Sequence, residues 1–136
     1  MSEKGLPVVP KFRVWLPDPD VERMLRVKAL VFEHDKTRCV CGYAYDFYLE
    51  DEDATIMQST GLFDKNGREI FDGDILTRNG RETLSIVRRG ILYSSLCFYI
   101  EVEHNGVKKF EPLNPHLPHF YTIVGNIHEN PELLGQ

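Results

Sequence analysis

Apolar and polar residues alternate along two early stretches of the chain, and this two-residue period is typical of β-strands with one buried face. The first stretch has its apolar side chains at Phe12, Val14 and Leu16. The second has its apolar side chains at Leu25, Val27, Ala29 and Val31. Proline and aspartate alternate over residues 17–20, so the pattern predicts a strand, a turn and a second strand. A helix from Val21 to Phe32 is the alternative, because Val21, Leu25 and Lys28 also fit a period of 3.6 residues.

The rest of the chain also carries mainly strand signals. Residues 33–54 are rich in aromatic side chains, with Tyr43, Tyr45 and Phe47 on one alternate set, and the four consecutive acids at 50–53 indicate a solvated loop. Further strands are predicted in ATIMQST, ETLSIVRR, LCFYIEVEH, VKKFEPL and HFYTIVGN. One helical turn is predicted at ENPELL, with Asn130 as N-cap and Pro131 at the first helical position.

Length and composition indicate one soluble globular unit. The chain has 136 residues and a mass of 15.8 kDa, which suits a single β domain over residues 11–136 behind a flexible tail at residues 1–10. No targeting or membrane-spanning segment is expected. Cys39 and Cys41 would share one face of a strand, too far apart for ordinary disulfide geometry. We therefore expect a reducing, cytoplasmic location.

The most distinctive stretch is GLFDKNGREIFDGDIL, from Gly61 to Leu76, which suggests a calcium loop at first reading. An EF-hand register would put Leu62 at the first ligand position and Gly73 at the twelfth, and neither can supply the required carboxylate. A hairpin fits better: Asp64 begins a type I turn and Gly67 takes the left-handed position of a G1 bulge. Asp64 then lies opposite Arg68 and Leu62 opposite Ile70. Residues 72–73 form a second tight turn before the next strand.

These residues also carry a family resemblance. The segment TGLFDKNGREIFDGDIL, preceded by TIMQS and followed by VGNIHENPELL, resembles the signature of the YopX family of phage and prophage proteins, and KFRVW followed by ERMLRV is similar to that family's N-terminal pattern. The resemblance spans Lys11 to Leu134, although residues 33–54 and 78–120 match only loosely. It implies a mainly-β fold with a small SH3-like barrel and carriage on mobile genetic elements, and hence a bacterial host cell. The N-terminal strands predicted above are additional to that barrel. The family has no established biochemical role, so no catalytic residue is carried over.

Three groupings of residues are candidates for a catalytic or metal-binding site. Cys39 and Cys41 with His34, or with His116 and His119, could form a zinc site, but C-x-C is not the spacing of a zinc knuckle. Cys97 lies in a strand-like run with no base assigned beside it, so core packing is favoured. The acids of the third grouping could form a two-metal nuclease centre, but turn formation is favoured: Asp64, Glu69, Asp72 and Asp74. We therefore expect no catalytic residue, no cofactor, no metal and no enzymatic activity.

Charge is unevenly distributed along the chain. The net charge is -5 and the isoelectric point is near 5.5, which argues against a general nucleic-acid binder. Residues 78–110 nevertheless hold six basic and three acidic residues, with Arg88 and Arg89 expected between strands and Lys108 and Lys109 after a turn at residues 104–106. A three-residue loop there would set Phe110 opposite Val102 and Lys108 opposite His104. Such a hairpin would contact phosphates, with Tyr93 or Tyr99 stacking on bases; alternatively, the lysines answer Glu101 and Glu103 on a solvated face.

The leading hypothesis is a non-enzymatic binding or self-association module. No association with a membrane is expected. Exposed strand edges and a set of aromatic residues support a homo-oligomer or docking to a protein partner of the mobile element. The aromatic set is Trp15, Tyr43, Tyr45, Phe47 and Tyr48. The alternative is a nucleic-acid-binding accessory factor in replication, recombination or regulation of the element. An enzyme acting on nucleic acid through the acids of residues 64–74 ranks last.

Overall fold

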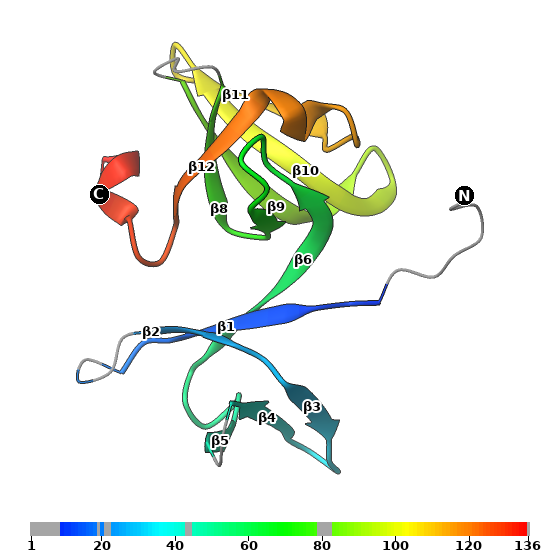
Figure 1. The fold of residues 1–136 in the computed structure, drawn as a ribbon, viewed down its shortest axis with the longest axis vertical. Coiled ribbons are helices and arrows are strands. Elements are labelled where there is room, and N and C mark those ends of the chain that lie inside the picture. The colour runs from blue at the N-terminus through cyan, green and yellow to red at the C-terminus, as the bar shows by residue number, and fades with distance from the viewer. Residues whose placement is uncertain (1–8, 19, 21–22, 43–44, 79–82, 136) are drawn as a thin grey trace.

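The computed structural model describes residues 9–18, 20, 23–42, 45–78 and 83–135. Within these ranges the chain forms twelve strands and two short 3-10 turns, so the predicted mainly-β fold is confirmed. Figure 1 shows the strands in two groups, with β3–β5 at one end and β8–β12 at the other, and the long strand β6 running between them. No helix among the described residues is long and apolar enough to cross a membrane. The predicted tail falls almost wholly outside the described residues, and the single domain over residues 11–136 stays a prediction.

The central sheet has the strand order β2-β1-β6-β7. Its strands are β1 (Phe12–Leu16), β2 (Arg23–Arg26), β6 (Thr55–Phe63) and β7 (Glu69–Phe71). The first predicted strand is confirmed as β1, whose Val14 and Leu16 are buried. The competing helix at residues 21–32 is wrong, because residues 23–26 and 29–32 are strands.

The second predicted strand is in fact two strands of different sheets. β2 pairs with β1, whereas β3 (Ala29–Phe32) pairs with β4 (Thr37–Cys41). The change of partner falls between two neighbours: the Val27 amide donates to Phe12 O at 3.1 Å, and the Lys28 amide donates to Val40 O at 2.7 Å. Alternation in the sequence reports which face is buried and carries no information about the partner strand, so the break was not predicted.

The small sheet β3-β4-β5 covers the first core cluster. β5 spans Tyr45–Tyr48, and the acids at 50–53 form an exposed turn after it, as predicted. Val14, Cys39 and Cys41 are the buried centre of this cluster. Tyr43 lies outside the described residues.

The third sheet has the order β11-β10-β9-β8-β12 and curls into a half-barrel (Figure 1). Its strands are β8 (Asp74–Arg78), β9 (Leu84–Leu92), β10 (Ser95–His104), β11 (Val107–Pro112) and β12 (Tyr121–Asn126). It encloses the second core cluster, made of Ile70, Leu76, Val87, Ile100, Tyr121 and Ile123. The finer expectation, an SH3-like barrel, stays a prediction.

Two details of this sheet correct the sequence interpretation. The β10–β11 hairpin closes through two residues: His104 lies opposite Val107, and both Asn105 and Gly106 have positive φ angles, of 54° and 78°. Asn-Gly is the pair that favours such a type I′ turn, so the predicted three-residue loop is wrong. The predicted opposition of Phe110 to Val102 is wrong too, because Phe110 lies opposite Glu101.

The second correction concerns the two neighbouring arginines. Arg88 and Arg89 lie inside β9 and not between strands, since β9 continues to Leu92. The β9–β10 turn is formed by Tyr93 and Ser94, whose φ angles of 51° and 65° give it the backbone twist that continues both strands.

The chain ends in the predicted helical turn, which is a 3-10 turn, η2 (Pro131–Leu134), after an earlier one, η1 (Leu117–Phe120). Pro131 stands at the start of η2, as predicted. Asn130 occupies the cap position but makes no side-chain cap hydrogen bond there. Its Oδ1 instead accepts the Asn126 amide at 3.1 Å, because the preceding chain folds back over β12.

Candidate functional site

The acidic stretch at residues 61–76 is a turn, as predicted. The Gly67 amide donates to Asp64 O at 2.9 Å, the Asp64 amide donates to Arg68 O at 2.8 Å, and Gly67 has a φ of +83°. The Asp64 carboxylate also serves the turn, because its Oδ1 accepts the amides of Asn66 and Arg68, both at 2.9 Å. A carboxylate oxygen that accepts two amides in this way stabilises the bend directly.

The other oxygen of Asp64 ties the turn to a distant strand. Its Oδ2 accepts the Ile123 amide at 3.0 Å, while the Lys65 amide donates to Tyr121 O and the Arg68 guanidinium to Ile123 O. Burial alone would raise the Asp64 pKa, but the three amides and the nearby Arg68 charge outweigh it and lower the pKa. The turn therefore covers the outer edge of β12 with its own hydrogen bonds.

The other acids of this stretch are Glu69, Asp72 and Asp74, and two of them accept hydrogen bonds from the chain itself. Asp74 is 2% exposed, and its carboxylate accepts the Arg13 guanidinium at 2.8 Å and the Phe71 amide at 2.7 Å. Burial raises the Asp74 pKa, and Arg13 offsets part of that rise. Glu69 accepts the Ser59 hydroxyl at 2.6 Å, and burial raises the Asp72 pKa. No group of three or more histidine, cysteine or acidic side chains in the described ranges is placed to hold a metal ion.

The two strand cysteines lie on one face, as predicted, with their sulfur atoms 3.7 Å apart and no disulfide between them. Burial raises the pKa of Cys39 to about 12 and raises that of Cys41. His34 is exposed on the loop that follows β3, His116 is exposed just before η1, and His119 is exposed within η1. Cys97 is half-buried in β10.

The four basic residues singled out in the sequence do not form one patch. Arg88 and Lys108 both contact Glu101, at 3.4 and 3.5 Å, on one face of the sheet. Arg89 follows Arg88 in the strand, so its side chain lies on the opposite face, where the guanidinium sits 5.5 Å from the centre of the Phe98 ring. One acid thus neutralises part of the charge predicted to contact phosphates.

The aromatic set is likewise divided among local contacts. Trp15 stacks on His128 with ring centres 5.6 Å apart. The Tyr45 and Phe47 rings of β5 have their centres 5.5 Å apart and are tilted by 48° to each other. The Tyr48 hydroxyl donates to Glu33 at 2.8 Å. Trp15 is thus engaged by His128, whereas the other three described rings of the set lie in β5. Docking through these rings stays a prediction.

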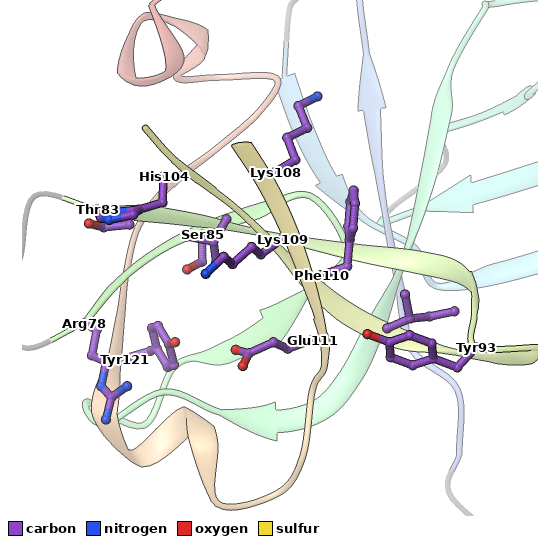
Figure 2. A pocket seen from close by; sticks show the side chains of 12 residues that line it. Arg78, Thr83, Ser85, Tyr93, His104, Lys108, Lys109, Phe110, Glu111 and Tyr121 are labelled. Atoms are coloured by element: carbon purple, nitrogen blue, oxygen red, sulfur yellow. The ribbon is translucent and has the colours of Figure 1, made fainter. Parts of the chain in front are cut away.

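A concavity that the sequence did not predict lies inside the curled sheet (Figure 2). Its volume is about 790 Å³, within the range of roughly 300 to 1,000 Å³ typical of ligand sites. The lining combines cationic, aromatic and hydroxyl side chains with a single acid. These residues are Arg78, Thr83, Ser85, Leu92, Tyr93, Val102, His104, Lys108, Lys109, Phe110, Glu111 and Tyr121. Figure 2 shows Lys109 and Glu111 pointing from β11 toward the side that holds Tyr121 and Arg78, whereas Lys108 points away.

The charge of the concavity is opposite to that of the whole chain. Arg78, Lys108 and Lys109 against Glu111 give +2 with His104 neutral, in a chain of net charge -5. Lys108 is shared with Glu101, so Arg78 and Lys109 are the two cations of the lining for which no ion pair is described. Tyr93 is 77% exposed at the rim. The lining can therefore attract an anion and offer it ring faces for stacking.

A second hollow lies between the central sheet and the turn at residues 64–68. Arg13 and Arg26 approach the Phe71 ring in it, at 4.8 and 5.9 Å from the ring centre. Arg13 is paired with Asp74 and Arg26 with Glu69. With Arg68, the lining has three arginines against two acids, a net +1, and Arg68 already donates to Ile123 O, so this hollow is the weaker candidate.

Comparison with known proteins gives a family and a fold. The family model described as YopX protein matches residues 11–135. The crystal structure of protein EF1440 from Enterococcus faecalis is similar to this chain, with 26% sequence identity and a TM-score of 0.50, over 94% of this chain and 99% of that chain. No curated protein matches the chain.

Proposed function

The chain belongs to the YopX family, and from this premise we propose that it is a non-enzymatic binding module of a bacterial mobile genetic element, working in the cytoplasm. Its binding surface is the concavity of the β8–β12 sheet, and its ligand is single-stranded nucleic acid. The observation that carries the proposal is the convergence of Arg78, Lys109, Tyr93 and Tyr121 from four separate elements on one hollow.

The chemistry of the lining supports a single strand over other anions. Proteins that bind single strands combine a positive groove for the phosphates with aromatic rings on which bases stack. Arg78 and Lys109 supply the charge, and Tyr93, 77% exposed at the rim, supplies a ring face for stacking. Tyr121 lines the hollow as a core residue that is 5% exposed. Bases reach such rings only when they are unpaired and unstacked, so a duplex is the poorer ligand.

The basic face predicted from the sequence is the weaker binding surface. Arg88 and Lys108 share Glu101, so a phosphate would have to displace that carboxylate first. The nucleic-acid proposal therefore keeps Lys109 from the predicted set and places Arg78 beside it, in place of Arg88 and Arg89.

The buried acids support a non-enzymatic role. A metal-dependent nuclease needs free carboxylate oxygens around an ion. Both carboxylate oxygens of Asp64 and of Asp74 accept hydrogen bonds from the chain itself, and Glu69 accepts the Ser59 hydroxyl. These hydrogen bonds hold the turn at residues 64–68 and the contact between β1 and Asp74, so they have a structural explanation.

The test is fluorescence anisotropy with a labelled single-stranded DNA oligonucleotide, its duplex and an acidic peptide as probes. The protein is compared with the double variant Arg78→Ala, Lys109→Ala. The matched control is Lys36→Ala, Arg38→Ala, which removes the same charge from the exposed surface of the β3–β5 sheet. Circular dichroism confirms that each variant is folded.

The proposal predicts tighter binding of the single strand than of the duplex, weakened by salt between about 50 and 200 mM. The Arg78, Lys109 variant lowers the salt slope by about 0.7 per lost phosphate contact, whereas the control leaves it unchanged. Absence of binding at low salt, equal loss in both variants, or preference for the acidic peptide contradicts the proposal.

A further inference from the structure

The two edges of the five-stranded sheet are treated differently by the chain. The outer edge of β12 is covered, because Lys65, Arg68 and Asp64 bond to the backbone of Tyr121 and Ile123. The edge at β11 is open: all six residues from Val107 to Pro112 are exposed. Within the described ranges no further strand lies beside β11. Open edges of this kind are the surfaces through which sheets pair with other chains.

The register of the hairpin fixes which backbone groups of β11 point outward. The Leu113 amide donates to Phe98 O at 2.9 Å, and His104 and Val107 close the two-residue turn. Hydrogen-bonded positions alternate along an antiparallel pair, so the odd-numbered residues of β11 bond to β10. The backbone groups of Lys108, Phe110 and Pro112 therefore point away from the sheet. Among the described residues no hydrogen bond reaches them.

We infer that β11 pairs antiparallel with β11 of a second copy of this chain, centred on Phe110. This inference goes beyond the proposed function and is argued from other observations. Both use Lys109, so pairing with the partner subunit competes with nucleic acid for that side chain. A two-fold axis perpendicular to the sheet leaves the two faces of the sheet unexchanged. Each residue of β11 therefore lies opposite a residue of the partner subunit whose side chain is on the same face. Only registers centred on a residue satisfy that condition.

Charge selects one of these registers. Centring on Lys108, Lys109 or Glu111 would set two like charges directly opposite each other, which destabilises a pair of strands. Centring on Phe110 sets Lys109 opposite Glu111 of the partner subunit, and this ion pair occurs twice by symmetry. The two Phe110 rings then meet across the axis, and each now packs edge-on against Tyr99 of its own chain at 5.9 Å.

The outward backbone groups fit the same register. The two Phe110 residues exchange both of their hydrogen bonds, and each Lys108 amide donates to the Pro112 carbonyl of the partner subunit. Proline lacks an amide, so the paired strand stops at residue 112. Val107 and Phe110 are 58% and 39% exposed in the single chain and lose exposure in the dimer.

The first test is molar mass by multi-angle light scattering over a wide concentration range, where the inference predicts twice the 15.8 kDa of one chain. Lys109→Glu alone and Glu111→Lys alone each raise the dimer dissociation constant by about tenfold or more, because attraction becomes repulsion at two symmetric pairs. The double variant Lys109→Glu, Glu111→Lys restores the dimer. A monomer at every concentration, a dimer insensitive to the single exchanges, or no rescue in the double variant overturns the inference.

The second test is amide hydrogen exchange, which needs no variant. The amides of Lys108 and Phe110 exchange more slowly as protein concentration rises, because pairing protects them. The amides of Lys109 and Glu111 bond to β10 in the single chain and do not change with concentration. Exchange at Lys108 and Phe110 that is independent of concentration overturns the inference. Measurement without nucleic acid separates this outcome from failure of the proposed ligand.

Discussion

The Asp64 carboxylate accepts the Ile123 amide at 3.0 Å, although the two residues are 59 positions apart in the chain. This bond joins the turn at residues 61–76 to β12, the strand in which the second segment of the sequence signature begins at Val124. Asp64 is 4% exposed and accepts three amides in total. The Asp64 position of the signature therefore has a structural role: it connects the turn to β12.

Replacing Asp64 by asparagine tests this role. An asparagine keeps one acceptor oxygen but turns a donor toward the amide that the second oxygen now accepts. We expect Asp64→Asn to lower the free energy of unfolding by about 2 to 3 kcal/mol, measured by urea denaturation. Asp46→Asn, at an exposed carboxylate paired with Arg38, is the control and should change it by less than about 0.5 kcal/mol. Equal effects in the two variants would contradict the structural role of Asp64.

The effect of Asp64→Asn should depend on pH. The folded-state pKa of Asp64 is lowered below the unfolded value of about 3.9, so its contribution is present above that pH and is lost as pH falls through the folded pKa. Asp72 and Asp74 have raised pKa values, so their effect on the pH dependence of stability is opposite to that of Asp64. The pH dependence of the unaltered protein alone therefore does not report on Asp64. The difference in stability between the protein and Asp64→Asn isolates Asp64. It should be largest near neutral pH and shrink below about pH 4; a difference that is constant down to pH 2 contradicts the assignment.

Gly125 is required by the fold-back of the chain after β12. A Cβ atom at this position would lie 2.5 Å from Asn130 Oδ1, the atom that accepts the Asn126 amide. Gly125→Ala should therefore cost about 1 to 3 kcal/mol of stability. Asn130→Ala removes the two nearest atoms, Oδ1 and Cγ, and leaves Cβ at 3.0 Å, so the double variant should cost less than the sum of the two single changes. Additive costs would show that the close approach is not what excludes a side chain there.

The buried thiols should be unreactive in the folded protein. Thiolate is the reactive form, and burial raises the pKa of Cys39 to about 12 and that of Cys41 above its usual value. Alkylation of both at pH 8, followed by mass spectrometry, should be slower by orders of magnitude than in urea. Cys97, half-buried in β10, is the internal comparison. Equal rates in the folded and unfolded protein would contradict the burial of Cys39 and Cys41.

Local structure was largely predictable from the sequence, whereas the assembly of strands was not. The turn at Asp64 and Gly67 and the strand at residues 12–16 follow from local rules of backbone geometry and alternation. The break at Val27, by contrast, depends on which strand each half pairs with, and alternation is silent about partners.

The candidate site shows the same division. Tyr93 and Lys109 were recognised from their residue types, but Arg78 and Tyr121 join them only because the sheet curls and β12 lies beside β8. Curvature depends on twist and on long-range pairing, which no local pattern encodes. The Asn-Gly pair at residues 105–106 did carry the signal for a two-residue hairpin, and the correct register follows once that signal is used.

The most direct test of the proposed function is an amide NMR titration of the isotopically labelled protein with a single-stranded DNA oligonucleotide. We expect chemical-shift changes confined to the concavity, at Tyr93, Lys109, Tyr121 and their neighbours. The β3–β5 sheet, including Lys36 and Arg38, serves as the internal control and should not respond. Shifts centred on that sheet, or no shifts at low salt, would contradict the assignment of the concavity as the binding surface.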